Sequence, residues 1–211
     1  MPPLGLIFDL DGTLIDTRRD ITVAVNAMRG FYHLPPLPEQ VISGYVGDGV
    51  KKLVERAIRG TPVDLGEALI VQRRFYREHL LDFATLYPGV AEGLRTLHRR
   101  GYTLAIATNK LLEFTESLLV HFQIRHLFQV VIGDGNAPTL KPDPAGILET
   151  LRQTGLPPES VWVVGDHHTD LEAGRRAGVR RIFVTWGIGH PGSEIPDLTV
   201  SSFDELVTRL P

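Results

Sequence analysis

Two aspartates stand two positions apart directly after a short apolar run near the start of the chain. Asp9 and Asp11 belong to the segment 8–13, FDLDGT. If the backbone is still extended there, period-two alternation directs both carboxylates to the same side. Two such close carboxylates repel each other unless they share a cation or a proton. The pair predicts a site where one carboxylate binds metal and attacks while the other moves a proton. The structural alternative is a strand that ends in a solvated Asp-Gly turn.

Thr108 and Asn109 follow the apolar run 103–107 and precede a helix expected from Leu111. A hydroxyl and free N–H groups at a helix N-terminus suit a phosphate group. Thr and Asn are also good helix caps. The two residues therefore indicate either phosphate binding or simple capping.

Lys141 lies between apolar and proline residues in the segment 140–144, LKPDP. The two prolines stiffen the backbone, and lysine supplies a compact positive charge. A lone lysine before proline is ordinarily a surface residue, so anion binding and a surface position both remain open.

A second pair of acidic residues follows the apolar run 161–164, in GDHHTD. Asp166 is placed to bind a hard cation, and Asp170 lies four residues on, one helical turn away on the same side. Asp170 also suits the N-terminus of a helix. His167 and His168 invite a zinc hypothesis, but neighbouring side chains diverge and no third His or thiolate accompanies them in the sequence. We therefore expect both histidines to be exposed at the rim of the site.

Five short apolar runs are typical of buried strands, at 4–8, 103–107, 129–132, 161–164 and 181–185. Helical patterns lie between the later runs, at 90–100, 111–122, 144–154 and 170–177. Strands that alternate with helices indicate an α/β fold with a doubly wound parallel sheet. Ligands of such sheets bind at the carboxyl ends of the strands, where all four polar segments fall.

Residues 16–85 contain helical patterns at 21–31, 50–58 and 67–81 and no convincing strand. This interval is much longer than a single crossover helix requires. The sequence therefore predicts an all-helical domain, 16–85, inserted into an α/β core made of residues 1–15 and 86–211.

The four polar segments, in this order, resemble the four signature motifs of the haloacid dehalogenase-like superfamily. The helical insertion has the size and position of the cap domain found in that superfamily. The resemblance implies a phosphatase in which Asp9 is the nucleophile that becomes an aspartyl phosphate. It implies that Asp11 is the general acid and then the general base.

The same resemblance implies a role for each remaining motif residue. Phosphate oxygens would be held by Thr108, the backbone of Asn109, and Lys141. Mg²⁺ would be held by the Asp9 carboxylate, the Asp11 carbonyl and Asp166, with Asp170 as a support behind them. One departure is His167, which stands where relatives have a small hydroxylated residue. Asp11 favours a phosphatase, because true dehalogenases of the superfamily lack this second aspartate.

The segment 44–50, GYVGDGV, with 53–57, LVERA, resembles the cap of phosphoglycolate phosphatases. It implies a small phosphorylated substrate, with 2-phosphoglycolate as the first expectation and Arg18, Lys51 or Arg56 available for a substrate carboxylate. A pyrophosphatase, a nucleotidase and a sugar phosphatase of the same superfamily remain alternatives. Dinucleotide binding by the glycine pattern is disfavoured, since no strand precedes it. A receiver-like phospho-switch is disfavoured because Asp9 follows the first strand and a long insertion is present.

The composition of the chain argues against several other kinds of partner and site. The formal charge is only -3 over 211 residues, without a cluster of basic and aromatic residues, so we expect no nucleic-acid partner. Cysteine is absent, which excludes disulfides and thiolate zinc sites. The run 4–8 is too short for a signal-peptide core or a membrane span, which favours a cytoplasmic location and no membrane partner. Oligomeric state, monomer or homodimer, cannot be read from the pattern.

Overall fold

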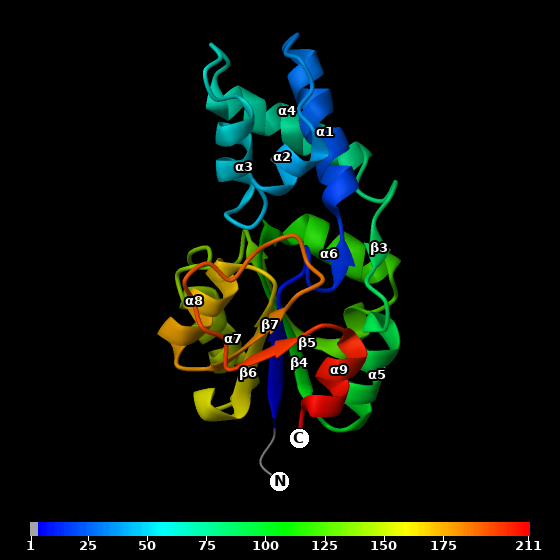
Figure 1. Cartoon of the computed structure of the whole chain (residues 1–211), viewed down its shortest axis with the longest axis vertical. Coiled ribbons are helices and arrows are strands. Elements are labelled where there is room, and N and C mark those ends of the chain that lie inside the picture. Colours follow the sequence, from blue (N-terminus) through cyan, green and yellow to red (C-terminus); the bar gives the residue numbers. More distant parts are fainter. Residues whose placement is uncertain (1–3) are drawn as a thin grey trace.

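The computed structural model describes residues 4–211, which form a six-stranded parallel sheet with helices on both faces and a group of helices above one end (Figure 1). The strand order is β5-β4-β1-β6-β7-β8. The strands are β1 Gly5–Phe8, β4 Thr103–Leu111, β5 Phe128–Asp134, β6 Val161–Gly165, β7 Arg180–Val184 and β8 Leu198–Val200. The predicted doubly wound parallel fold is confirmed.

Strand β1 occupies the middle of the sheet because almost every side chain in it is apolar and buried. Its residues pair in parallel with β4 on one side and β6 on the other, so that Phe8 aligns with Ile106 and Val164. Leu6 and Phe8 face one core cluster and Ile7 faces the other. This alternation is what a strand covered on both faces requires.

Helices cover both faces of the sheet. One face carries α7 Ala145–Thr154 and α8 His168–Ala177, whereas the other carries α5 Val90–Arg99, α6 Leu112–His121 and α9 Phe203–Arg209. Short 3₁₀ turns, Arg125–Leu127 and Pro158–Ser160, lead into β5 and β6. Phe8 stacks on Phe203 at 6.0 Å between ring centroids and meets Phe128 edge-on at 6.4 Å. These contacts fix the strand that ends at Asp9.

The remaining helices lie together above the carboxyl ends of the strands (Figure 1). They are α1 Arg18–Phe31, α2 Glu39–Ser43, α3 Val50–Ala57 and α4 Leu65–Glu78. The two chain segments that lead into and out of this group, β2 Ile15–Asp16 and β3 Thr85–Leu86, pair antiparallel. The insertion is therefore entered and left at one place.

All five predicted core strands are present within two residues of the predicted starts. The largest difference is β4, which continues through 108–110 to Leu111, so Thr108 and Asn109 lie in a strand and not at a helix start. The structure also contains β2, β3, α2, β8 and α9, which are too short to leave a periodic signal. The first three residues of the predicted core segment 1–15 lie outside the described residues.

No helix within residues 4–211 is both long enough and apolar enough to cross a membrane.

Candidate active site

A cleft lies between the carboxyl ends of the central strands and the inserted helices, and it gathers the predicted site residues. The core contributes Asp9, Asp11, Thr108, Asn109, Lys110, Lys141, Asp166, His167 and Asp170, together with apolar residues such as Phe114. The helical group contributes Ile21, Val46, Gly47, Val50, Leu53, Gln72 and Tyr76. Residues distant in sequence therefore meet here, as the positions of the four segments at strand ends predict.

Lys141 is buried and joins two of the carboxylates. Its Nζ atom donates to Asp9 Oδ1 at 2.8 Å, to Asp170 Oδ1 at 2.6 Å and to the Ala107 carbonyl at 2.7 Å. Burial alone would lower the pKa of Lys141, but Asp170 and Asp9 raise it above its ordinary value. Lys141 is thus a fixed cation inside the site, and the alternative of a surface lysine is wrong.

Asp170 belongs to the N-terminal turn of α8 as well as to the site. Its Oδ2 accepts from the His167 backbone N–H at 3.0 Å, and His167 is the N-cap residue of a reciprocal capping box. Its Oδ1 accepts from Lys141. Both oxygens have partners, so Asp170 orients Lys141 and the helix start together.

Asp166 is the most enclosed acidic group of the cleft after Asp170. Its Oδ2 accepts from the backbone N–H groups of Ile188 and Gly189, both at 2.8 Å, and its Oδ1 accepts from Thr13 at 3.1 Å. Gly12 has φ +83°, and a Cβ there would lie 2.2 Å from Asp166 Oδ2. The aspartate loop can approach Asp166 this closely only because residue 12 is glycine.

The carboxylates outnumber the cations in this part of the cleft. One oxygen each from Asp9, Asp166 and Asp170 lies within 4.8 Å of the other two. Burial raises the pKa of Asp166 to about 7, with further contributions from Asp170 and Asp9, and burial also raises the pKa of Asp9 although Lys141 opposes this. A group of buried oxygen ligands with excess negative charge fits a hard divalent cation.

A comparison with protein families agrees with the fold and with the group of site residues described above. Residues 6–184 match the family described as "Haloacid dehalogenase-like hydrolase". The chain belongs to the haloacid dehalogenase-like hydrolase family. The match includes all four polar segments and the inserted helices, so the resemblance of the motifs is confirmed.

Curated relatives cover nearly the whole chain. A phosphoglycolate phosphatase of Chromobacterium violaceum is 38% identical over 210 residues, which is 96% of this chain and 94% of that protein. One from Aquifex aeolicus is 33% identical over 202 residues, covering 96% and 94%. A crystal structure of a predicted phosphoglycolate phosphatase from Haemophilus somnus 129pt has TM-score 0.91, with 28% identity over 98% of this chain and 97% of that one.

In this member of the hydrolase family, Asn109 connects three segments around the cleft. Its Nδ2 donates to the carbonyls of Gly47 and Lys141, both at 2.8 Å, and its Oδ1 accepts from the Lys141 N–H at 2.8 Å. The residue before α6 is Leu111, whose side chain cannot cap a helix. The alternative that Thr108 or Asn109 caps that helix is therefore wrong, because both lie within β4.

Lys110 is a site residue that the sequence reasoning missed. Its Nζ donates to Asp11 Oδ1 at 2.9 Å and Oδ2 at 3.1 Å, and to the Tyr76 hydroxyl at 2.5 Å. Thr17 also donates to Asp11 Oδ1, at 2.7 Å. Burial alone would lower the pKa of Lys110, but Asp11 and Tyr76 raise it above its ordinary value. A second buried cation thus faces the second aspartate.

The three cations expected from the helical insertion lie elsewhere. Arg18 forms a two-bond ion pair with Asp16, and Arg56 pairs with Asp48 at 2.5 Å and bonds the Tyr45 carbonyl. Lys51 is exposed. Among the residues that the structure describes, none of these three lines the cleft.

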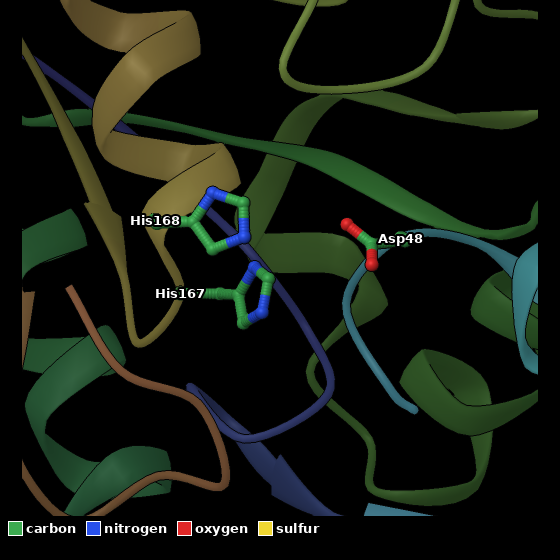
Figure 2. A group of neighbouring side chains, drawn as sticks. All are labelled: Asp48, His167 and His168. Atoms are coloured by element: carbon green, nitrogen blue, oxygen red, sulfur yellow. The ribbon is translucent and has the colours of Figure 1, made fainter. Parts of the chain in front are cut away.

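The two adjacent histidines lie side by side, as Figure 2 shows, with Asp48 opposite them. Their ring centroids are 4.2 Å apart, and both residues are half-buried. The expectation of diverging, exposed side chains is wrong because the chain changes from extended at His167 to helical at His168. Burial lowers the pKa of His167 to about 4, with a smaller contribution from His168.

Proposed function

We propose that this chain is a Mg²⁺-dependent phosphatase that hydrolyses 2-phosphoglycolate through a phosphorylated Asp9. The observation that carries the proposal is the arrangement around Asp9: Lys141 at 2.8 Å, with Asp166 in the same group of carboxylates. A carboxylate can attack a phosphate dianion only if the charge of both is offset. The names of the curated relatives supply the substrate.

We assign each step of the reaction to a residue of the cleft. Asp9 attacks phosphorus, the bond from phosphorus to the glycolate oxygen breaks, and Asp11 donates a proton to that oxygen. Asp11 then takes a proton from water, which attacks phosphorus, releases inorganic phosphate and restores Asp9. Lys141 holds the Asp9 carboxylate in one orientation throughout. We assign contacts to the phosphate oxygens to Thr108, the backbone of Asn109, and Lys141.

Mg²⁺ suits the oxygen donors of the site, for which we propose the Asp9 carboxylate, the Asp11 carbonyl and Asp166. When bound, it supplies charge neutralisation for the phosphate and for the attacking carboxylate. Asp170 stays with Lys141 and the helix start, since both of its oxygens already have partners.

The substrate carboxylate needs a cation of its own, and we propose Lys110 for this role. Lys110 lies in the cleft beside Tyr76 of α4, and apart from Gln72 much of the helical wall is apolar. When Asp11 carries the proton for the leaving group, Lys110 loses its anionic partner and can pair with the glycolate carboxylate. Lys110 suits this role better than Arg18, Lys51 or Arg56, because it lines the cleft and those three residues do not.

We also propose that residues 16–85 act as a cap domain on a core of residues 1–15 and 86–211. The antiparallel pair formed by β2 and β3 brings both connections together, which suits a hinge. Closure of the cap excludes bulk water from the attack on phosphorus.

A panel of phosphate esters tests the substrate. With Mg²⁺ present, kcat/KM for 2-phosphoglycolate should exceed that for sugar phosphates, nucleotides and pyrophosphate by at least about tenfold, the effect of one well-placed charged contact. A sugar phosphate or nucleotide as the best substrate would retain the phosphatase and refute phosphoglycolate.

A further inference from the structure

Three histidines and one aspartate converge at the mouth of the cleft, beside the carboxylate site. His167 and His168 begin α8, His190 comes from the loop after β7, and Asp48 comes from the loop between α2 and α3. The His190 ring centroid lies 5.7 Å from those of both His167 and His168. Ligand atoms of Asp48, His167 and His168 lie within 4.8 Å of one another (Figure 2).

Each of these four side chains has an atom that could coordinate a metal and that forms no hydrogen bond within residues 4–211. His167 Nδ1 is 2.9 Å from Thr169 Oγ1, and with its proton on Nδ1 the ring donates to this hydroxyl, so that the lone pair of Nε2 is available to a metal. His190 Nδ1 accepts from the Gly192 N–H at 3.2 Å, so this ring binds a metal through Nε2 once it gives up that bond and its proton moves to Nδ1. Arg56 bonds one oxygen of Asp48, Oδ2.

Gly47 lets the Asp48 loop approach the histidines. Its φ is +112°, and a Cβ at this position would lie 2.8 Å from both Cε1 and Nε2 of His167. Asn109 holds the same loop through the Gly47 carbonyl. The edge of the imidazole that carries Nε2 therefore faces the loop from the helical insertion.

The loop that carries His190 is anchored at two points. Next to His190, the N–H groups of Ile188 and Gly189 donate to Asp166. Further along, Glu194 forms ion pairs with Arg175 at 3.1 Å and Arg181 at 3.6 Å. The histidines therefore meet on fixed backbone, and His190, whose side chain is exposed, can rotate toward the other two.

We propose that His167, His168 and Asp48, with His190 as a fourth ligand, bind a transition-metal ion such as Zn²⁺. Imidazole nitrogens suit Zn²⁺, Ni²⁺ and Cu²⁺, whereas Mg²⁺ prefers the all-oxygen site next to them. The ligand atoms of Asp48, His167 and His168 already lie within 4.8 Å of one another, so small side-chain rotations are all that a tetrahedral ion requires of them. Because Asp48 belongs to the helical insertion and the histidines to the core, the bound ion holds the two together.

Metal titration of the Mg²⁺-saturated protein tests this site. Excess Mg²⁺ occupies the carboxylates, and Zn²⁺ is then added in competition with a chromophoric chelator. We expect wild type to bind one Zn²⁺ equivalent more than the double variant His168→Gln/His190→Gln, whose affinity for that ion should fall at least about a hundredfold. Co²⁺ in place of Zn²⁺ should give the intense visible absorption of a tetrahedral ion in wild type only.

The matched control is His121→Gln/His126→Gln, which removes two exposed histidines outside the cluster. It should bind Zn²⁺ and Co²⁺ as wild type does, and melting curves in chelator confirm that both double variants fold. The separate variant Asp48→Asn should weaken Zn²⁺ binding and leave folding intact. An equal Zn²⁺ content in wild type and His168→Gln/His190→Gln, or an equal loss in the control, would overturn the proposal. The binding readout needs no substrate, so it stands apart from the phosphatase assay.

Discussion

Two buried lysines divide the work of charge compensation between the two aspartates of the first motif. Lys141 contacts Asp9, and Lys110 contacts Asp11. In the proposed mechanism, Lys141 orients the nucleophile Asp9, and Lys110 holds the proton donor Asp11 until substrate binds. The proposal thus assigns one cation to the phosphate and another to the leaving group.

The variant Lys110→Met tests whether Lys110 binds the substrate carboxylate. Methionine keeps most of the side-chain volume but removes the charge, so we expect kcat/KM for 2-phosphoglycolate to fall about 10- to 100-fold, mainly through KM. The kcat/KM for hydroxyethyl phosphate, which carries an uncharged hydroxymethyl group in place of the carboxylate, should fall much less. Equal losses for both substrates, measured by phosphate release, would show that Lys110 acts only on Asp11.

Three of the four motifs could be found from the sequence because they directly follow apolar runs, but the role of Lys110 could not be found that way. Its partners Asp11 and Tyr76 are 99 and 34 residues away, and only the folded chain brings them together. A local signal did exist. Lys110 follows Thr108 by two positions, the period of a strand, and the expectation of a helix cap at that point concealed it.

At the level of elements, the junction between the helical insertion and the core contains one unusual group. Asp20 lies in the first turn of α1, fully buried, and its Oδ1 accepts from the Phe83 N–H at 2.9 Å. Within residues 4–211 its Oδ2 has no hydrogen-bond partner. Asp20 thus connects the start of α1, where the chain enters the insertion, to Phe83, where the chain leaves it. This contact requires the burial of a carboxyl group, which is energetically unfavourable.

This cost should appear as a pH dependence of stability. Burial is the main cause that raises the pKa of Asp20 to about 6, from an ordinary value of 3.8. The folded state therefore binds the proton more tightly than the unfolded chain, and stability is lost as pH rises from about 4 to about 6. Over this pH range, the free energy of unfolding of the wild type should decrease relative to that of Asp20→Asn.

Urea unfolding of both proteins at about pH 4.5 and pH 7.5 measures the effect. The other titratable groups are common to the two proteins, so the difference between their stabilities isolates Asp20. A difference that is the same at both pH values would contradict the assignment.

The long elements could be predicted because their patterns extend over several turns or a whole buried strand. The elements β8 and α9 could not, since three and seven residues carry too little periodicity. The position of His190 beside His167 also depends on the loop after β7, which has no pattern of its own. Local sequence patterns therefore do not predict which loop residues come together in the site.

At the scale of the whole molecule, the account requires a cation at the point where core and helical insertion meet. The carboxylates of Asp9 and Asp166 are buried together, and a bound divalent ion should stabilise the native state by mass action. At about 100 times its Kd, Mg²⁺ added to chelator-treated protein should raise the melting temperature by roughly 5–10 °C. Phosphatase activity should vanish in chelator and return with Mg²⁺.

Asp166→Asn supplies the comparison for this measurement. The variant should fold, because asparagine can keep the contacts of one carboxylate oxygen, but Mg²⁺ should no longer raise its melting temperature. Differential scanning fluorimetry measures both melting temperatures. If Mg²⁺ raised the melting temperature of Asp166→Asn as much as that of wild type, the cation would bind elsewhere.

The central claim is that Asp9 carries the phosphoryl group during turnover. Acid quenching in the steady state with 2-phosphoglycolate and Mg²⁺, followed by borohydride reduction and peptide mass spectrometry, tests it directly. We predict conversion of residue 9 to homoserine in wild type, no conversion in Asp9→Asn, and a loss of kcat of at least about 1,000-fold in that folded variant. Rapid turnover by Asp9→Asn, or a phosphorylated residue other than Asp9, would contradict the account.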